Sequence, residues 1–153
     1  MKNDMLGAAT ILGVISYLSK MKIKKNVIGL LAIAENMPGR TATKPGDVVK
    51  SHSGKLVEIV DTDAEGRLVM ADAISYSHKF NPKLIIDVAG LTGQQESLSA
   101  GLFAGIMGNN SNKIKDLIKV GEKTNERLVE LPIYRENMEQ TKSDIADVRN
   151  FSY

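Results

Sequence analysis

The segment "DTDAEGRL", residues 61–68, holds three carboxylates in eight positions: Asp61, Asp63 and Glu65. In an extended or loop backbone, residues two apart point the same way, so the side chains of Asp63 and Glu65 can converge on one point. Carboxylates held this close repel one another unless one is protonated or a cation lies between them. Their oxygens are hard ligands, which suit Mg²⁺, Mn²⁺ or Zn²⁺. The segment is therefore a candidate metal site.

The next two residues of the segment agree with this chemistry. Gly66 allows a close approach of the backbone, and Arg67 places a permanent cation beside the carboxylates. The same residues also fit a solvated turn in which Arg67 pairs with the acidic side chains. The spacing alone leaves both interpretations open.

Asp4 is a second candidate ligand. It stands at the start of an apolar helical pattern, where the helix dipole favours a negative charge. The alternative is that Asp4 caps the N-terminus of that helix, which is a common role for Asp. His52 and His78 are each isolated along the chain, and we assign neither a role.

The rest of the chain alternates helical patterns with continuous apolar runs. This alternation predicts an α/β fold, layered as α/β/α around a mixed, mostly parallel sheet, in which ligands gather beyond the carboxyl ends of strands. The spacing predicts helices over 5–18, 68–80 and 112–131, buried strands over 27–34, 83–91 and 102–108, and a hairpin over 48–60.

Composition limits the class of protein. The 153 residues fit one domain and are 42% hydrophobic and 25% charged, with a net charge of +2 and no cysteine. The small net charge favours neither a nucleic-acid nor a membrane partner, and the lack of cysteine fits a reducing compartment. The start of the chain lacks a signal-peptide cleavage pattern, and no run of residues is apolar and long enough to span a bilayer. We expect a cytoplasmic protein.

The acidic segment closely resembles "NTDAEGRL", the signature of the leucyl aminopeptidase (cytosol aminopeptidase) family of two-metal peptidases. Other segments resemble further motifs of this family in the same order and spacing. They are "MKNDMLGAA" at 1–9, "GLLAIAENMPG" at 29–39, "KPGDVVKSHSGKLVEI" at 44–59, "DVAGLTG" at 87–93 and "KSDIADVRN" at 142–150. The resemblance implies an enzyme that releases N-terminal residues, leucine and similar, from peptides.

The resemblance also implies roles for individual residues. Asp4, Asp63 and Glu65 would bind two divalent ions, Mn²⁺ or Zn²⁺ with Mg²⁺ as a further option, and Glu65 would bridge them. Arg67 matches an arginine that holds a bicarbonate acting as general base. Leu91 would contact substrate through its carbonyl, whereas Met1 and Gly93 would line the pocket for the first side chain of the substrate.

The chain also departs from the family pattern. The family's lysine ligand, bridging aspartate and catalytic lysine lie upstream of the matched motifs, and its separate N-terminal domain has no counterpart here. Asp61 stands where Asn is usual, and Gly90 where Thr is usual. We therefore expect residues 1–153 to be part of the catalytic domain, incomplete at both ends and inactive alone. The complete protein would be a homo-hexamer. The alternative is an inactive interaction subunit that pairs with full-length relatives.

Overall fold

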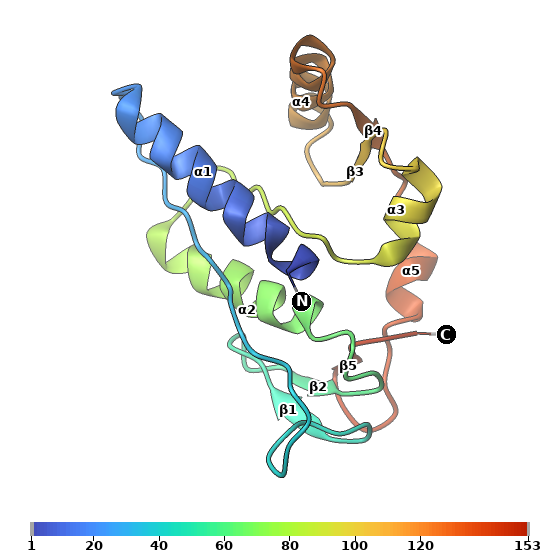
Figure 1. Ribbon diagram of the computed structural model, residues 1–153. Coiled ribbons are helices and arrows are strands. Elements are labelled where there is room, and N and C mark those ends of the chain that lie inside the picture. The colour runs from blue at the N-terminus through green and yellow to red at the C-terminus, as the bar shows by residue number, and fades with distance from the viewer. Residues whose placement is uncertain (1, 153) are drawn as a thin grey trace. The chain divides into compact units, whose positions relative to one another are not determined.

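A computed structural model describes residues 2–152 and confirms the α/β class (Figure 1). The chain divides into two compact units, which are described separately. The first comprises the chain up to Leu91 together with the segment from Thr141 onward, and the second is Thr92–Gln140. Among residues 2–152, no helix is long and apolar enough to cross a membrane.

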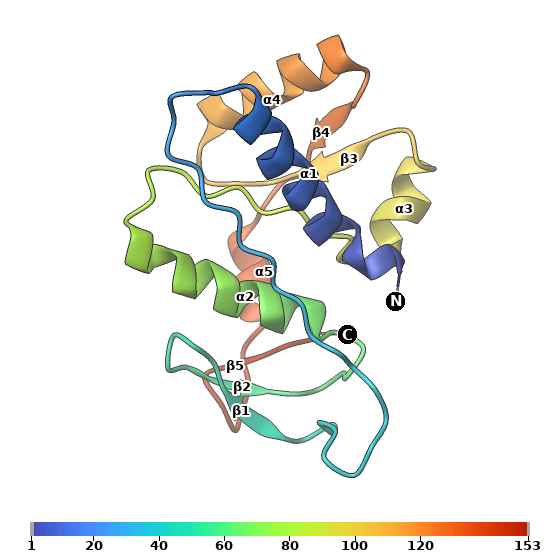
Figure 2. The ribbon, with the colours of Figure 1, turned by 60° about the vertical axis from the view of Figure 1, so that its left-hand side comes forward.

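The first unit begins with an apolar helix that lies beside two segments without regular structure. A short 3₁₀ helix, η1 (Asn3–Met5), leads into α1 (Leu6–Lys20). Segments 27–34 and 83–91 run alongside α1 (Figures 1 and 2). We call α1 and these two segments the apolar layer.

Glycines allow the close contacts within the apolar layer. A Cβ atom added to Gly7 would overlap the carbonyl oxygen of Val88, and one added to Gly29 would lie 2.8 Å from Cγ1 of Ile15. Gly7 thus lets α1 lie close to segment 83–91, and Gly29 lets segment 27–34 lie close to α1.

The strands predicted over 27–34 and 83–91 are not formed in this structure. A strand requires a hydrogen-bonded neighbour, and neither segment pairs with a strand among residues 2–152. Their side chains are exposed rather than buried: Val27 is 51%, Ile33 62% and Ile86 54% accessible. The apolar runs that predicted buried strands are thus extended segments with much uncovered apolar surface.

A small mixed sheet completes the first unit. Strands β1 (Val48–Lys50) and β2 (Leu56–Glu58) form the predicted antiparallel hairpin, and β5 (Val148–Arg149) pairs with β2 in parallel, giving the order β1-β2-β5. Gly54 has φ +89° in the hairpin turn, a conformation that favours glycine. The polar C-terminal tail therefore contributes a strand that the sequence did not predict.

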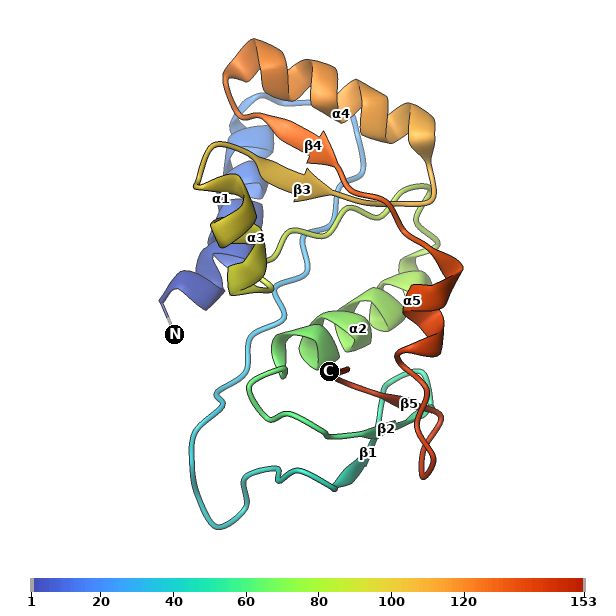
Figure 3. The ribbon, with the colours of Figure 1, turned by 90° about the vertical axis from the view of Figure 1, so that its right-hand side faces the viewer.

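Helix α2 (Gly66–Ser77) follows β2 and lies across one face of this sheet (Figure 3). It is anchored at the hairpin, where His52 N–H donates to Asp72 Oδ1 (2.8 Å) and His52 Nδ1 lies 2.9 Å from Ser75 Oγ. A 3₁₀ turn, η2 (His78–Phe80), extends it to Asn81, which has φ +50°. The predicted helix over 68–80 is confirmed, including its end before Pro82.

The second unit is a strand–helix–strand arrangement. Strands β3 (Ala104–Ile106) and β4 (Leu128–Glu130) pair in parallel, with α4 (Ser111–Thr124) between them in the chain (Figure 3). Two short helices, α3 (Gly93–Ser99) and α5 (Arg135–Glu139), flank this arrangement in the sequence.

A strand forms within the predicted range 102–108, but it is not buried as predicted, since Leu102 is 67% and Met107 57% exposed. The helix predicted over 112–131 is wrong beyond residue 124. Asn125 adopts φ +62° and ends α4, and residues 128–130 form a strand. A left-handed residue after the last turn is a common helix stop.

The fully buried residues are few. In the first unit, the buried apolar side chains are Val57, Ile59 and Ala64, which lie on β2 and in the connection to α2; in the second unit, Ile114 is buried. The main core of the first unit is therefore directly beneath the segment that carries the candidate ligands.

Candidate metal centre

The candidate ligands lie in the connection between β2 and α2, residues 59–65, which we call the signature loop. Its start is fixed by Ile59, which is 1% exposed. The Ile59 backbone N–H donates to Asp47 O (2.8 Å), and its carbonyl accepts from Gly46 N–H (2.7 Å). The loop therefore leaves the sheet from a rigid, buried position.

Within the loop, Asp61 organises the backbone. Its Oδ1 accepts a hydrogen bond from Asp63 N–H (2.9 Å), and its carbonyl accepts from Ala64 N–H (3.3 Å). A short acidic side chain that bonds the backbone two residues ahead is a frequent turn-forming arrangement. This leaves the Asp63 side chain exposed and Ala64 buried.

At the junction of the loop and α2, two buried side-chain atoms have no hydrogen-bond partner among residues 2–152. They are Oε2 of Glu65 and Nε of Arg67. Leaving a buried polar group unpaired costs about 1–3 kcal/mol, and more for a charged group. A cation beside Glu65 and an anion beside Arg67 would relieve these costs. The donor chemistry of the loop thus fits the predicted metal and bicarbonate.

The number of ligands is lower than a metal ion requires. Across residues 2–152, no group of three or more His, Asp or Glu side chains lies close enough to hold a metal ion. Asp63 and Glu65 lie in one loop, whereas Asp4 lies in η1. The described residues offer carboxylate ligands without a complete coordination shell.

Asp4 is not a helix cap. The residue at the N-cap of α1 is Met5, and the residue at the N-cap of η1 is Lys2, neither with a side-chain cap. The capping alternative for Asp4 is therefore not supported, and the carboxylate stays a candidate ligand.

The residues predicted to contact substrate are distributed along the chain. Leu91 is 41% exposed, and its Cδ1 lies 3.8 Å from where a Cβ on Gly66 would be, so it is beside the start of α2. Gly93 is the first residue of α3, in the second unit. Met1 lies outside the described residues.

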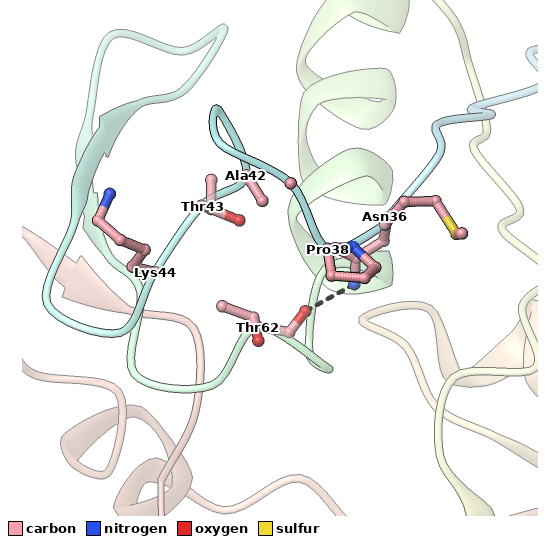
Figure 4. Close-up of a pocket in the computed structure, with 8 residues that line it drawn as sticks. Asn36, Pro38, Ala42, Thr43, Lys44 and Thr62 are labelled. Carbon is pink, nitrogen blue, oxygen red and sulfur yellow. Dashed lines mark hydrogen bonds between the residues drawn. The ribbon is translucent and has the colours of Figure 1, made fainter.

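A pocket of about 390 Å³ lies beside the signature loop, where Thr62 lines it (Figure 4). It is lined by Thr62 of the signature loop and by Asn36, Met37, Pro38, Gly39, Ala42, Thr43 and Lys44. Asn36 Nδ2 donates to Thr62 O (2.8 Å). The "ENMPG" part of the motif at 29–39 therefore contacts the signature loop directly.

Asn150 and Phe151 also contact this site, and neither was predicted from the sequence. Asn150 is 4% exposed and bonds the signature loop, and the Phe151 ring centre lies 5.7 Å from the Arg67 guanidinium carbon. The available signal was the Asn that ends the "KSDIADVRN" motif.

Comparison with known proteins identifies the family. A sequence model of the cytosol aminopeptidase family, catalytic domain, matches residues 1–153. The chain belongs to this family.

Several members resemble it over most of its length. A probable cytosol aminopeptidase of Geobacter sulfurreducens is 47% identical over 98% of the chain, and a cytosol aminopeptidase of Pseudomonas aeruginosa is 45% identical over the same share. The structure of a tomato leucine aminopeptidase mutant, K354E, is 33% identical and superposes with a TM-score of 0.91 over 100% of the chain. The chain spans 30% of the length of each of these proteins.

The two departures from the cytosol aminopeptidase pattern have physical explanations. Asp61 uses only Oδ1 for its side-chain bond to Asp63, and an Asn would present the same acceptor. A Cβ on Gly90 would lie 3.3 Å from the carbonyl oxygen of Asn3, so a larger residue would press on the segment that carries Asp4.

Proposed function

We propose that this chain supplies part of the metal centre of a cytoplasmic metallo-aminopeptidase that releases N-terminal residues, leucine and similar, from peptides. Asp4, Asp63 and Glu65 are the proposed metal ligands. The observation that carries the proposal is the buried Oε2 of Glu65, which has no hydrogen-bond partner and lies in the family's signature segment.

Each residue has a distinct proposed role. Glu65, Asp63 and Asp4 would together hold two divalent ions through their carboxylate oxygens, with Glu65 shared between the ions and Asp63 also offering its carbonyl. When bound, two divalent ions, Mn²⁺ or Zn²⁺ with Mg²⁺ as a further option, polarise the scissile carbonyl and lower the pKa of a water molecule.

The remaining proposed residues act on proton transfer and substrate. The Nε–H of Arg67, buried with no hydrogen-bond partner among residues 2–152, would hold an anion such as bicarbonate, which could serve as a general base. The Leu91 carbonyl accepts a hydrogen bond from the peptide, and Met1 and Gly93 line the pocket for its first side chain. We further propose that the complete protein is a homo-hexamer.

The test is to transplant residues 1–153 into the Pseudomonas aeruginosa relative in place of its corresponding segment. We expect the chimera to hydrolyse leucine amide with Mn²⁺ or Zn²⁺ and its Glu65→Gln variant to lose at least about 99% of that activity, because the bridging charge is removed. A folded, metal-loaded chimera without activity, or an equally active Glu65→Gln variant, would overturn the proposal.

A second function is supported by the exposed apolar layer. Val27, Ile33 and Ile86 are all more than half exposed, an arrangement typical of surfaces that bind another chain. We propose as the alternative an inactive subunit that pairs with full-length relatives. Co-expression with such a relative should yield a co-purifying complex, and a stable monomer that never co-purifies would exclude this function.

A further inference from the structure

The Asn150 side chain joins the C-terminal segment to the signature loop through four hydrogen bonds. It is 4% exposed and follows β5 directly. Its Oδ1 accepts from Val60 N–H (2.8 Å) and Asp61 N–H (3.3 Å), whereas its Nδ2 donates to Asp61 O (2.7 Å) and Ala64 O (3.3 Å). The side-chain amide thus makes all four hydrogen bonds that an Asn can make.

All four bonds end on backbone atoms of residues 60–64. One side chain thus holds the loop backbone at both ends of this turn. These bonds do not involve any side chain of the loop itself. No other residue type of this size presents two acceptor sites and two donors on adjacent atoms. An Asp would retain the acceptors but lose the donors, and a Leu would lose both.

The position of Asn150 is set by the sheet and not by the loop. Asn150 N–H donates to Glu58 O (3.0 Å), and Asp147 N–H donates to Leu56 O (3.1 Å). On the same segment, Asp147 Oδ2 accepts from Leu56 N–H (2.8 Å), and Ser143 Oγ donates to Glu58 Oε2 (2.6 Å). The amide is therefore presented to the loop from a segment already fixed on β2.

From this arrangement, we infer that Asn150 is a positioning residue for the metal-binding loop. By fixing the backbone from Val60 to Ala64, it sets the direction in which Asp63 and Glu65 present their carboxylates. Phe151, the next residue, places its ring 5.7 Å from the Arg67 guanidinium carbon, so the same segment contacts both ends of the site. The part of this inference that concerns metal rests on the proposed function, whereas the part that concerns loop order does not.

The test compares Asn150→Ala with Ser143→Ala in the full chain. Ser143→Ala is the matched control, because it weakens the attachment of the same segment to β2 without removing a bond to the loop. Two quantities are measured in each variant: hydrogen exchange of the Val60 and Asp61 amides by NMR, and the Mn²⁺ dissociation constant by titration. Glu65→Gln reports whether Mn²⁺ binds at the proposed site at all.

We expect Asn150→Ala to speed exchange of both amides by about tenfold or more and to weaken Mn²⁺ binding by about 10–100-fold, as loss of a group supporting metal ligands does. Ser143→Ala should leave both quantities within about twofold of wild type. The inference is overturned if Asn150→Ala changes them no more than Ser143→Ala does.

Two further outcomes are also decisive. If the wild-type chain and Glu65→Gln bind Mn²⁺ equally weakly, residues 2–152 do not hold the ion by themselves, and amide exchange alone decides whether Asn150 positions the loop. If Asn150→Ala does not fold, Asn150→Asp replaces it. That variant should keep the Val60 amide protected, while the Ala64 amide, which bonds the Asp61 carbonyl, should exchange faster because Asp61 O loses the Asn150 donor. Wild-type exchange throughout would overturn the inference.

Discussion

The signature loop and the apolar layer belong to the same unit but are ordered by different interactions. The loop is short, its anchor Ile59 is 1% exposed, and Asn150 bonds its backbone at four points. The apolar layer has no hydrogen-bonded ladder among residues 2–152, and Ile33 within it is 62% exposed.

This difference separates what the chain supplies for itself from what it leaves to a neighbour. Backbone groups of the loop form hydrogen bonds within the first unit, whereas Oε2 of Glu65 and Nε of Arg67, at the start of α2, are buried with no hydrogen-bond partner among residues 2–152. Apolar side chains in the layer find few partners. The comparison predicts that substitutions in the loop affect the stability of the chain, whereas substitutions on the exposed layer affect association with another chain.

The same substitution in the two regions should give the largest contrast. Ile59→Ala is expected to lower the free energy of unfolding by about 2–5 kcal/mol, because it leaves a cavity in the core beneath the loop. Ile33→Ala should change it by less than about 0.5 kcal/mol. Urea unfolding measures both, and equal effects would mean that the layer is packed as tightly as the loop anchor.

A second pair of variants tests the packing that the layer does have. Gly7→Ala should destabilise the chain by about 1–3 kcal/mol, because the added Cβ would overlap the Val88 carbonyl oxygen. Gly13→Ala in the same helix meets no atom within 4 Å and should instead stabilise by about 0.5–1 kcal/mol. Thermal unfolding followed by circular dichroism measures the difference, and two stabilising variants would contradict the contact between α1 and segment 83–91.

A third pair of variants tests the contribution of the Asp61 side chain to the loop. Asp61→Ala should cost about 0.5–1.5 kcal/mol, since Asp63 N–H loses its acceptor. Asp61→Asn keeps the acceptor and should remain within about 0.5 kcal/mol of wild type. Urea midpoints decide this, and an Asn variant as unstable as the Ala variant would show that the charge of Asp61 matters rather than its oxygen.

The smallest expected effect is a pH dependence at the turn that precedes β1. The pKa of Asp47 is lowered, first by the Lys44 backbone N–H (2.8 Å) and then by the Lys44 ammonium (3.1 Å). Because the pKa of Asp47 is lower in the folded chain, its ionised carboxylate stabilises the turn at pH values above the ordinary pKa. This stabilisation is lost as the pH falls through the lowered pKa of the folded chain.

The Asp47 carbonyl also accepts a hydrogen bond from Ile59 N–H, so protonation of the Asp47 side chain should loosen the turn beside the loop anchor. We expect the thermal midpoint to fall slightly at pH values below about 4. Asp47→Asn should remove this part of the pH dependence. Thermal melts at pH 6 and pH 3 test it, and an identical pH profile for the variant would assign the effect to other carboxylates.

Local patterns predicted much of the fold. The hairpin over 48–60 and the helix over 68–80 are confirmed, and a strand forms within 102–108. Each depends on neighbours within a few residues, such as the glycine at the hairpin turn or the Asn-Pro after the helix. The helix over 112–131 was overextended because the left-handed conformation of Asn125 breaks a pattern that remains apolar and periodic beyond it.

The sequence by itself determined the family, the α/β class and the segment in which carboxylates are concentrated, because motifs and periodicity are local properties of the chain. Only the tertiary structure decided that β5 pairs with β2 and that Asn150 holds a loop 86–90 residues earlier. It also decided that segments 27–34 and 83–91 have no sheet partner among residues 2–152. Such contacts depend on which distant segments meet and on whether hydrogen-bonding neighbours are within reach, and no local spacing encodes that choice.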